Sequence, residues 1–324
     1  SELPGAPIER VSEVSEGLTT PTSAFRTDLV GCITCHGTEL CRSSNPDMTI
    51  SAKYNQDAAC TVWPIAGQSH IAFFGVFDGH GESGHRCSHY CMRRVVDYIT
   101  EHVSELESDA GGVLSRAYAQ ADELLGQRHP AWAEYGGTTA CSVIMVGKQL
   151  TIANCGDSRF VLGRRRDEKS PLEHKDLSVD QNPDNPSEQA RIKKAGGYVG
   201  REDENSEIRV WMDESMSSSG LSMARSLGDH TFKEAGVISE PVITEHTVRS
   251  KDEVLIGASD GVFSVLSSKD VMKVIEGISK ETPGGPRMLA GRTAQEVLTK
   301  SARKWKEEEG DMRDDISVII IKLP

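Results

Sequence analysis

Apolar residues recur in two different periods along this chain of 324 residues. Short apolar or alternating runs predict β-strands, and these fall near residues 28–35, 47–52, 58–65, 70–77, 138–146, 149–154, 158–163, 253–258 and 315–322. Apolar residues at helical spacing predict helices, over residues 84–104, 110–127, 186–195, 268–278 and 291–307. Runs of strands separated from pairs of helices indicate a layered α+β domain rather than a parallel α/β fold.

Two segments depart from this periodicity. Residues 1–24 are rich in Ser, Thr, Glu and Pro, which predicts a mobile N-terminal tail. Residues 200–219 are charged and then serine-rich, so we expect a mobile insertion there. The remainder, residues 25–324, is long enough to bury the core of one catalytic domain, and we expect a monomer.

Charge and hydropathy exclude several classes of partner. The chain carries 36 Lys and Arg against 49 Asp and Glu, a formal net charge of −13. Such a balance disfavours binding to nucleic acid or to an anionic membrane. The longest apolar runs, such as residues 316–321, are too short to span a bilayer, and no basic-then-apolar leader opens the chain. We therefore expect an intracellular protein, in the cytoplasm or nucleus.

The stretch AFFGVFDGHGESG, residues 72–84, contains a glycine turn that matches the dinucleotide-binding pattern G-x-G-x-x-G. That interpretation needs an acidic residue at a second strand end about 20 residues later. Asp97 has the right distance but lies inside the predicted helix 84–104. Asp78 also opens the turn with a negative charge, which repels phosphates. An acid at the end of a strand suits a cation better.

Three further motifs compete with simpler interpretations. Cys32-Ile33-Thr34-Cys35-His36 matches the haem-attachment pattern C-x-x-C-H, and Cys41 adds a zinc ligand, but thiols in a strand and turn explain them as well. Residues 87–93 match the C-x5-R loop of cysteine-dependent phosphatases, yet they contain no glycine and fit a helix. His85 and His89, near Cys87 and Cys91, suggest either a zinc face or the polar side of that helix.

Carboxylates stand where apolar strands end. Asp78, Asp157 and Asp260 each follow an apolar strand, and Asp314 lies just before the final strand. A single Asp-Gly is usually a turn, but four such sites can converge at one edge of a sheet. Mg²⁺ and Mn²⁺ are bound by a few carboxylates in this way and keep several waters.

Nine motifs in order resemble the type 2C family of metal-dependent serine/threonine protein phosphatases, over nearly all of residues 28–324. They are NQD at 55–57, DGHG at 78–81, GGTTA at 136–140, NCGDSR at 154–159, D-x-x-P with E-x-x-R-I at 180–192, RVW at 209–211, GLSMARSLGD at 220–229, ASDGV at 258–262 and DDISV at 314–318. The resemblance implies a four-layer α-β-β-α sandwich, with two antiparallel sheets face to face and a dinuclear metal site at one end.

The family's metal ligands carry over residue by residue. Asp78 matches the carboxylate that bridges two Mg²⁺ or Mn²⁺ ions, Gly79 the residue that gives its carbonyl to one of them, and Asp260 and Asp314 the ligands of the other. Two cations sharing a water lower the pKa of that water and make hydroxide available for in-line attack on phosphorus. His80 matches the family's general acid, although it could instead orient a water.

Other positions depart from the commonest family pattern. Gln56-Asp57 replaces Glu-Asp, and the amide would act on the metal through water. Lys53 stands one place from the family's phosphate-binding Arg; it either binds the substrate phosphate as a point charge or is a solvated strand residue.

A third, weaker metal is left open. Asp157 and Thr139 match positions associated with it, but Ser264 replaces the second acid of that site. Arg225 and Asp229 match positions that hold the core and the flap, so they stand outside the predicted catalytic set.

The predicted function is the hydrolysis of phosphoserine and phosphothreonine in signalling phosphoproteins. The alternative is a phosphatase-like binding module that keeps the fold and has lost turnover. Loss of metal ligands would favour that alternative, and Asp78, Asp260 and Asp314 are all present.

Overall fold

Two five-stranded antiparallel sheets form the centre of the protein in this computed structural model, which describes residues 29–41, 49–167, 169–204, 206–216, 219–281 and 289–323. The first sheet has the strand order β1 (Val30–Cys35), β17 (Ile316–Lys322), β16 (Asp252–Ala258), β10 (Arg159–Arg164) and β11 (Glu173–Asp176). The second has the order β15 (Val242–Thr247), β9 (Gln149–Cys155), β8 (Ala140–Val146), β5 (Ile71–Phe77) and β4 (Ala58–Val62). The tail predicted over residues 1–24 lies outside the described residues.

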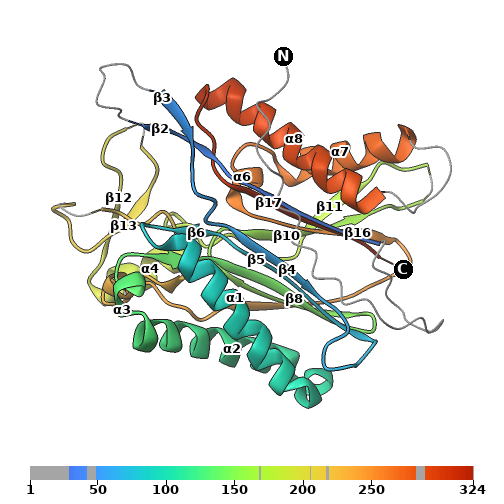
Figure 1. Ribbon diagram of the computed structural model, residues 1–324, viewed down its shortest axis with the longest axis horizontal. Helices are drawn as coiled ribbons and strands as arrows, with labels where there is room; N and C mark the ends of the chain where they lie inside the picture. Colours follow the sequence, from blue (N-terminus) through green and yellow to red (C-terminus); the bar gives the residue numbers. More distant parts are fainter. Residues whose placement is uncertain are drawn as a thin grey trace.

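Helices cover the outer face of each sheet (Figure 1). Helices α1 (Gly84–Glu101) and α2 (Leu106–Arg128) pack on the second sheet, and α7 (Ser268–Glu281) and α8 (Leu289–Glu309) pack on the first. The order helix, sheet, sheet, helix confirms the predicted α+β sandwich of four layers. None of the helices in the described ranges is both long and apolar enough to cross a membrane.

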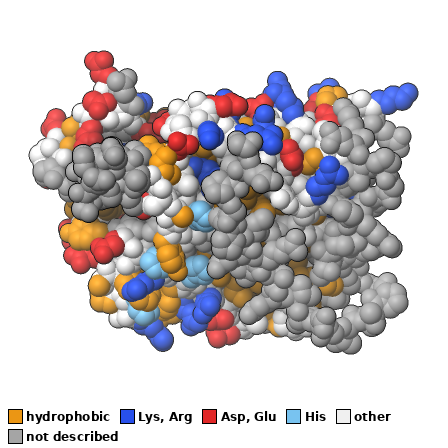
Figure 2. Space-filling view, turned by 45° about the horizontal axis from the view of Figure 1, so that its top comes forward, with side chains coloured by type: hydrophobic (Ala, Val, Ile, Leu, Met, Phe, Trp, Pro, Cys, Tyr) orange, Lys and Arg blue, Asp and Glu red, His pale blue; other side chains and the backbone are white. Residues whose placement is uncertain are grey.

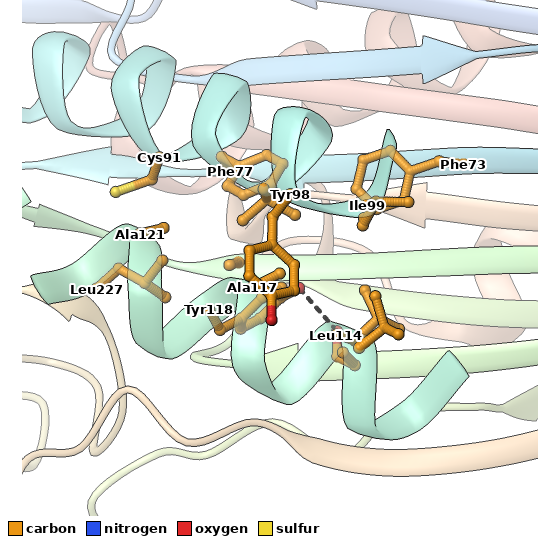
Figure 3. Packing of buried hydrophobic residues seen from close by; sticks show 14 of the residues in the cluster. Phe73, Phe77, Cys91, Tyr98, Ile99, Leu114, Ala117, Tyr118, Ala121 and Leu227 are labelled. Atoms are coloured by element: carbon orange, nitrogen blue, oxygen red, sulfur yellow. Dashed lines mark hydrogen bonds between the residues drawn. The ribbon is translucent and has the colours of Figure 1, made fainter. Parts of the chain in front are cut away.

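Strand β5 shows why the layers form. Alternate side chains of a strand point to opposite faces of its sheet. All seven residues of β5 are buried, because both faces of the sheet are covered. Phe73 and Phe77 enter the core under α1 and α2, whereas Phe74 and Val76 enter the core between the two sheets. Figure 3 shows Phe73 and Phe77 among the side chains of that helix-covered core. Each buried Phe stabilises the fold by about 1.5–3 kcal/mol.

A smaller core lies beside the sandwich, around α4 (Pro186–Ala195), β12 (Tyr198–Gly200) and β13 (Arg209–Trp211). Helix α4 begins where the Asn185 side chain accepts a hydrogen bond from the Ser187 N–H, and ends at Gly196 with φ 99°, a left-handed conformation that glycine adopts readily at helix ends. Residues 200–219 were expected to form a mobile insertion, but Arg209–Trp211 within them form strand β13, which pairs with β12.

The structure contains short elements that the hydrophobic pattern did not predict. They are β2 (Thr38–Cys41), β6 (Gly79–His80), β7 (Gly137–Thr138), β12, β13, β14 (Leu227–Gly228), the 3₁₀ turn Val103–Glu105, α3 (Pro130–Ala133), α5 (His230–Lys233) and α6 (Asp260–Phe263), besides the edge strands β11 and β15. β3 (Thr49–Ala52) lies within a predicted strand. Elements of two to four residues are too short to show a period, and β11 reads EHKD, with no apolar residue.

Candidate active site

Three strand ends bring the predicted carboxylates to one end of the sandwich. Asp78 follows β5, Asp260 follows β16, and Asp314 precedes β17. Strands β16 and β17 are antiparallel neighbours with Ala258 opposite Val318, so the end of one lies beside the start of the other. Asp78 and Asp260 come from different sheets, yet their carboxyl groups share a hydrogen bond.

The electrostatics of this cluster favour a bound cation. Burial, reinforced by the charges of Asp57, Asp260 and Asp314, raises the pKa of Asp78 well above its usual value. Burial and Asp314 raise the pKa of Asp260 to about 6, and burial with Asp315 raises the pKa of Asp57 to about 8. Buried carboxylates at close range resist ionisation because nothing balances their charge.

Unpaired carboxylate oxygens are a second feature that favours a bound cation. Buried Oδ1 atoms of Asp57, Asp157 and Asp260 have no hydrogen-bond partner among the described residues, although buried polar atoms are normally paired. Within those residues, no group of three His, Cys, Asp or Glu side chains is arranged as a complete metal site. The donor set therefore fits a hard cation that takes most of its ligands from water.

The loop that carries Asp78 is held from two sides. Thr139 accepts a hydrogen bond from the Asp78 N–H at 3.0 Å through Oγ1 and donates its own N–H to the Asp78 carbonyl at 2.8 Å. Gln56 Nε2 donates to the Gly81 carbonyl at 2.6 Å. Gly79 is required, since a Cβ there would lie 2.4 Å from two backbone oxygens. Thr139 and Gln56 thus position the loop.

His80 contacts a residue outside the predicted catalytic set. Its Nε2 lies 2.7 Å from Oδ2 of Asp229, a buried carboxylate. Burial lowers the pKa of His80, but the charge of Asp229 outweighs it and the pKa is raised overall. The sequence interpretation missed this contact because the two residues are 149 positions apart. The only sequence signal was Asp229's place in the SLGD motif.

Lys53 lies at the site but is paired with a predicted metal ligand. Its Nζ donates a hydrogen bond to Asp314 Oδ1 and lies 3.3 Å from Asp315 Oδ2. Burial lowers the pKa of Lys53, yet the two carboxylates raise it overall. The ammonium group of Lys53 therefore supplies the positive charge next to Asp314 in this structure. Asp315 is 2% exposed and also accepts from the N–H groups of Gly37 and Gln56.

Asp157 lies next to the main cluster. Burial and the charges of Asp260 and Asp180 raise the pKa of Asp157 well above its usual value. Ser264 caps the end of α6, where its N–H donates to the Asp260 carbonyl. Asp157 is thus an acid beside Asp260, and the position expected to hold a second acid is Ser264.

The competing motifs lie in ordinary secondary structure. Cys87 and Asp97 lie within α1, which confirms the helical interpretation of residues 87–93. Burial raises the pKa of Cys87 to about 12, so its thiol is not activated. Cys32 and Cys35 lie in β1.

Aromatic rings pack against His85 in α1 and against His129 after α2. The ring of His85 lies 4.5 Å from that of Tyr54, His129 stacks on Trp132 at 3.9 Å, and Arg86 lies 5.1 Å from the Trp132 ring. Figure 2 shows histidine side chains gathered beside hydrophobic and basic ones on one face of the molecule. His85 thus packs against an aromatic ring.

Comparison with known proteins agrees with this geometry. The family model "Protein phosphatase 2C" matches residues 35–305. "Probable protein phosphatase 2C 64" of Oryza sativa subsp. japonica is 34% identical over 281 residues, which are 83% of this chain and 62% of that protein. "Probable protein phosphatase 2C 35" of Arabidopsis thaliana is 32% identical over 292 residues, 84% of this chain and 79% of that protein.

Solved structures share the fold. Serine-threonine phosphatase 2C from Toxoplasma gondii superposes with a TM-score of 0.74 at 21% identity, covering 91% of this chain and 94% of that one. A C. elegans sex determining protein superposes with a TM-score of 0.72 at 23% identity, covering 91% and 64%. The chain therefore belongs to the protein phosphatase 2C family, whose members are metal-dependent serine/threonine protein phosphatases.

Proposed function

We propose that this protein hydrolyses phosphoserine and phosphothreonine in phosphoproteins, with two Mg²⁺ or Mn²⁺ ions held by Asp78, Gly79, Asp260 and Asp314. One observation carries the proposal: the carboxyl groups of Asp78 and Asp260, which come from different sheets, share a hydrogen bond within reach of the charge of Asp314. Burial raises the pKa of both Asp78 and Asp260. Two cations at such a site supply an activated water and balance the phosphate charge.

The protein's own groups then prepare the reaction. Asp78 is fixed through its backbone by Thr139, so its carboxylate can serve both cations without moving. Gln56 and Asp57 support the site: Gln56 holds the carbonyl of Gly81, and Asp57 accepts from Ser259 Oγ at 2.9 Å. A rigid set of ligands lowers the reorganisation needed in the transition state.

His80 is placed to complete phosphate ester cleavage. The oxygen of the departing Ser or Thr is a poor leaving group and needs a proton as its bond to phosphorus breaks. His80 Nδ1 is buried and has no partner among the described residues, while Nε2 faces Asp229. We assign His80 as the general acid; the competing role is to orient a water.

Lys53 would contribute on the substrate side. The ammonium of Lys53 balances the charge of Asp314 in the metal-free protein, and it would be released from that role if Asp314 held a cation. It can then hold a phosphoryl oxygen as a point charge. In the alternative role, Lys53 only keeps Asp314 and Asp315 in place.

Asp157 could take part in binding a third cation with water. It has an unpaired buried oxygen, but Ser264 stands where a second acid would be needed.

The physiological substrates are phosphoproteins of signalling pathways in this proposal, and the chain acts as a monomer. A binding module without turnover is disfavoured because every carboxylate of the proposed site is present.

Turnover of a phosphothreonine peptide tests the function. Protein stripped with a chelator and dialysed is assayed without metal and after addition of Mn²⁺ or Mg²⁺. We expect no turnover without metal and full recovery with it. Metal that binds, by calorimetry, yet restores no turnover would identify the binding module instead.

A further inference from the structure

Asp229 is held in an unusual backbone conformation beside the proposed active site. Its φ is 50° and its ψ 45°, a left-handed region that non-glycine residues seldom occupy. Its N–H donates to the Gly136 carbonyl at 2.9 Å, and its Oδ2 accepts from Ser226 Oγ at 2.6 Å. Strain of this kind persists where surrounding contacts enforce it, and often at functional sites.

The segment around Asp229 is anchored to α2. Asp122 Oδ1 accepts a hydrogen bond from the Gly228 N–H at 2.7 Å and lies 3.1 Å from Nε2 of His230. Gly137 leaves the space for the Asp229 carboxylate, since a Cβ at that glycine would lie 2.3 Å from Oδ2. The carboxylate therefore has a fixed position.

This fixed carboxylate determines which nitrogen of His80 can react. Asp229 Oδ2 lies 2.7 Å from Nε2, so Nε2–H is committed to the carboxylate. The other nitrogen, Nδ1, is buried without a partner among the described residues. Nδ1 is thus the ring nitrogen that is left without a hydrogen-bond partner in that part of the chain.

We infer that Asp229 is a positioning residue that orients His80, so that Nδ1 delivers the proton to the leaving serine or threonine oxygen. The inference rests on the proposed function. As a water oxygen forms its bond to phosphorus and the ester P–O bond breaks, the electron pair of the broken bond stays on the leaving oxygen, which takes the proton from Nδ1 of protonated His80. Neutral His80 remains bonded through Nε2–H to Asp229. A carboxylate that holds an imidazole in one orientation acts in this way in other enzymes.

A purely structural role for Asp229 makes a different prediction. If Asp229 only stabilises residues 226–230, its loss disturbs the site for every substrate alike. If it acts through His80, its loss matters only where the leaving group needs a proton. Phosphothreonine has a strongly basic leaving oxygen, whereas p-nitrophenyl phosphate releases a weakly basic one.

The test compares kcat for a phosphothreonine peptide and for p-nitrophenyl phosphate in the Mn²⁺-loaded enzyme. For Asp229→Asn we expect kcat on the peptide to fall about 100-fold, the lower range for losing a positioned acid. We expect kcat on p-nitrophenyl phosphate to change less than about threefold and the KM of both to stay near wild type. Asp122→Asn is the matched control, because Asp122 anchors the same segment without contacting His80; its effect should be equal on both substrates.

A double mutant separates the roles further. In a His80→Ala background, Asp229→Asn should cause no additional loss on the peptide, because two residues that act as one unit are not additive. Should Asp229→Asn fail to fold, Ser226→Ala, which removes one bond to Asp229, should show a smaller loss with the same substrate selectivity. Equal losses on both substrates, or additive losses in the double mutant, would overturn the positioning role of Asp229 and leave the proposed function standing. A wild-type protein without Mn²⁺-dependent turnover of either substrate would overturn the proposed function, and this inference with it.

Discussion

Burial and the negative charge of Asp314 raise the pKa of Asp260, whereas its hydrogen bond with Asp78 lowers it. We expect Asp260→Asn to weaken metal binding and to lower turnover by about 1,000-fold, because two-metal catalysis needs both cations. The metal-free variant should melt no lower than the metal-free wild type, since one of several repelling carboxylates is gone. Calorimetric metal titration and melting in chelator measure both effects.

The matched control for Asp260 is Asp167→Asn. Asp167 is an exposed turn residue whose side chain accepts from the N–H groups of Lys169 and Ser170. That variant should bind metal and turn over substrate as wild type does. Unchanged metal affinity and near-normal turnover in Asp260→Asn would refute the ligand assignment.

Lys53 has two roles that kinetics can separate. If its ammonium holds the phosphoryl group, Lys53→Ala should raise KM for phosphopeptides by about tenfold and also lower kcat, because the charge acts on binding and during transfer. Lys53→Arg should recover more of the loss than Lys53→Gln, since a guanidinium offers two donors.

Metal affinity gives the second readout for Lys53. Its ammonium competes with a cation for Asp314 in the metal-free protein, so Lys53→Ala should not weaken metal binding. An Ala variant with unchanged kcat/KM removes Lys53 from the substrate site and leaves the metal assignment standing.

Among the secondary structure elements, α1 contains residues 87–93, which match the C-x5-R loop of cysteine-dependent phosphatases. Cys87 is fully buried in this helix, and burial raises the pKa of its thiol to about 12. Cys87→Ser should therefore keep at least half of the wild-type turnover, and thiol reductants should not restore activity to chelated enzyme. Steady-state assays with Mn²⁺ test this. A folded but inactive Cys87→Ser protein would revive the cysteine mechanism.

For the whole molecule, the raised carboxyl pKa values predict how metal and pH affect stability. Asp57 and Asp260 have folded pKa values of about 8 and about 6 without metal, above the unfolded value near 4. The folded metal-free protein therefore binds more protons than the unfolded chain. The stability that these groups contribute is present below about pH 4 and is lost as pH rises toward 8.

The measurable consequence is a difference between two melting curves. The Tm of metal-free protein should fall between pH 6 and pH 8, and saturating Mg²⁺ should stabilise the protein more at pH 8 than at pH 6. Mg²⁺ competes with fewer protons at the higher pH and pairs with the ionised carboxylates. Thermal scans at fixed ionic strength check this. Equal stabilisation by Mg²⁺ at both values would contradict the predicted coupling.

The sequence by itself indicated a layered α+β domain and placed carboxylates at the ends of apolar strands. Buried strands such as β5 have apolar residues on both faces, and the strands that lead into Asp78 and Asp260 could be located from that pattern because a strand end is a local feature. The helix that contains Cys87 and Asp97 was predictable for the same reason. Edge strands such as β11 were not, since polar residues on an exposed edge carry no hydrophobic period.

Only the tertiary structure decided which side chains meet. Lys53 and Asp314 are 261 residues apart, and His80 and Asp229 are 149 apart. No local pattern encodes such contacts, because they depend on how two sheets and their connecting loops pack. The strained backbone of Asp229 is likewise imposed by its neighbours, Ser226 and Gly136. The sequence thus indicated the acids of the proposed site, while packing across the sandwich gave Lys53 and His80 their partners.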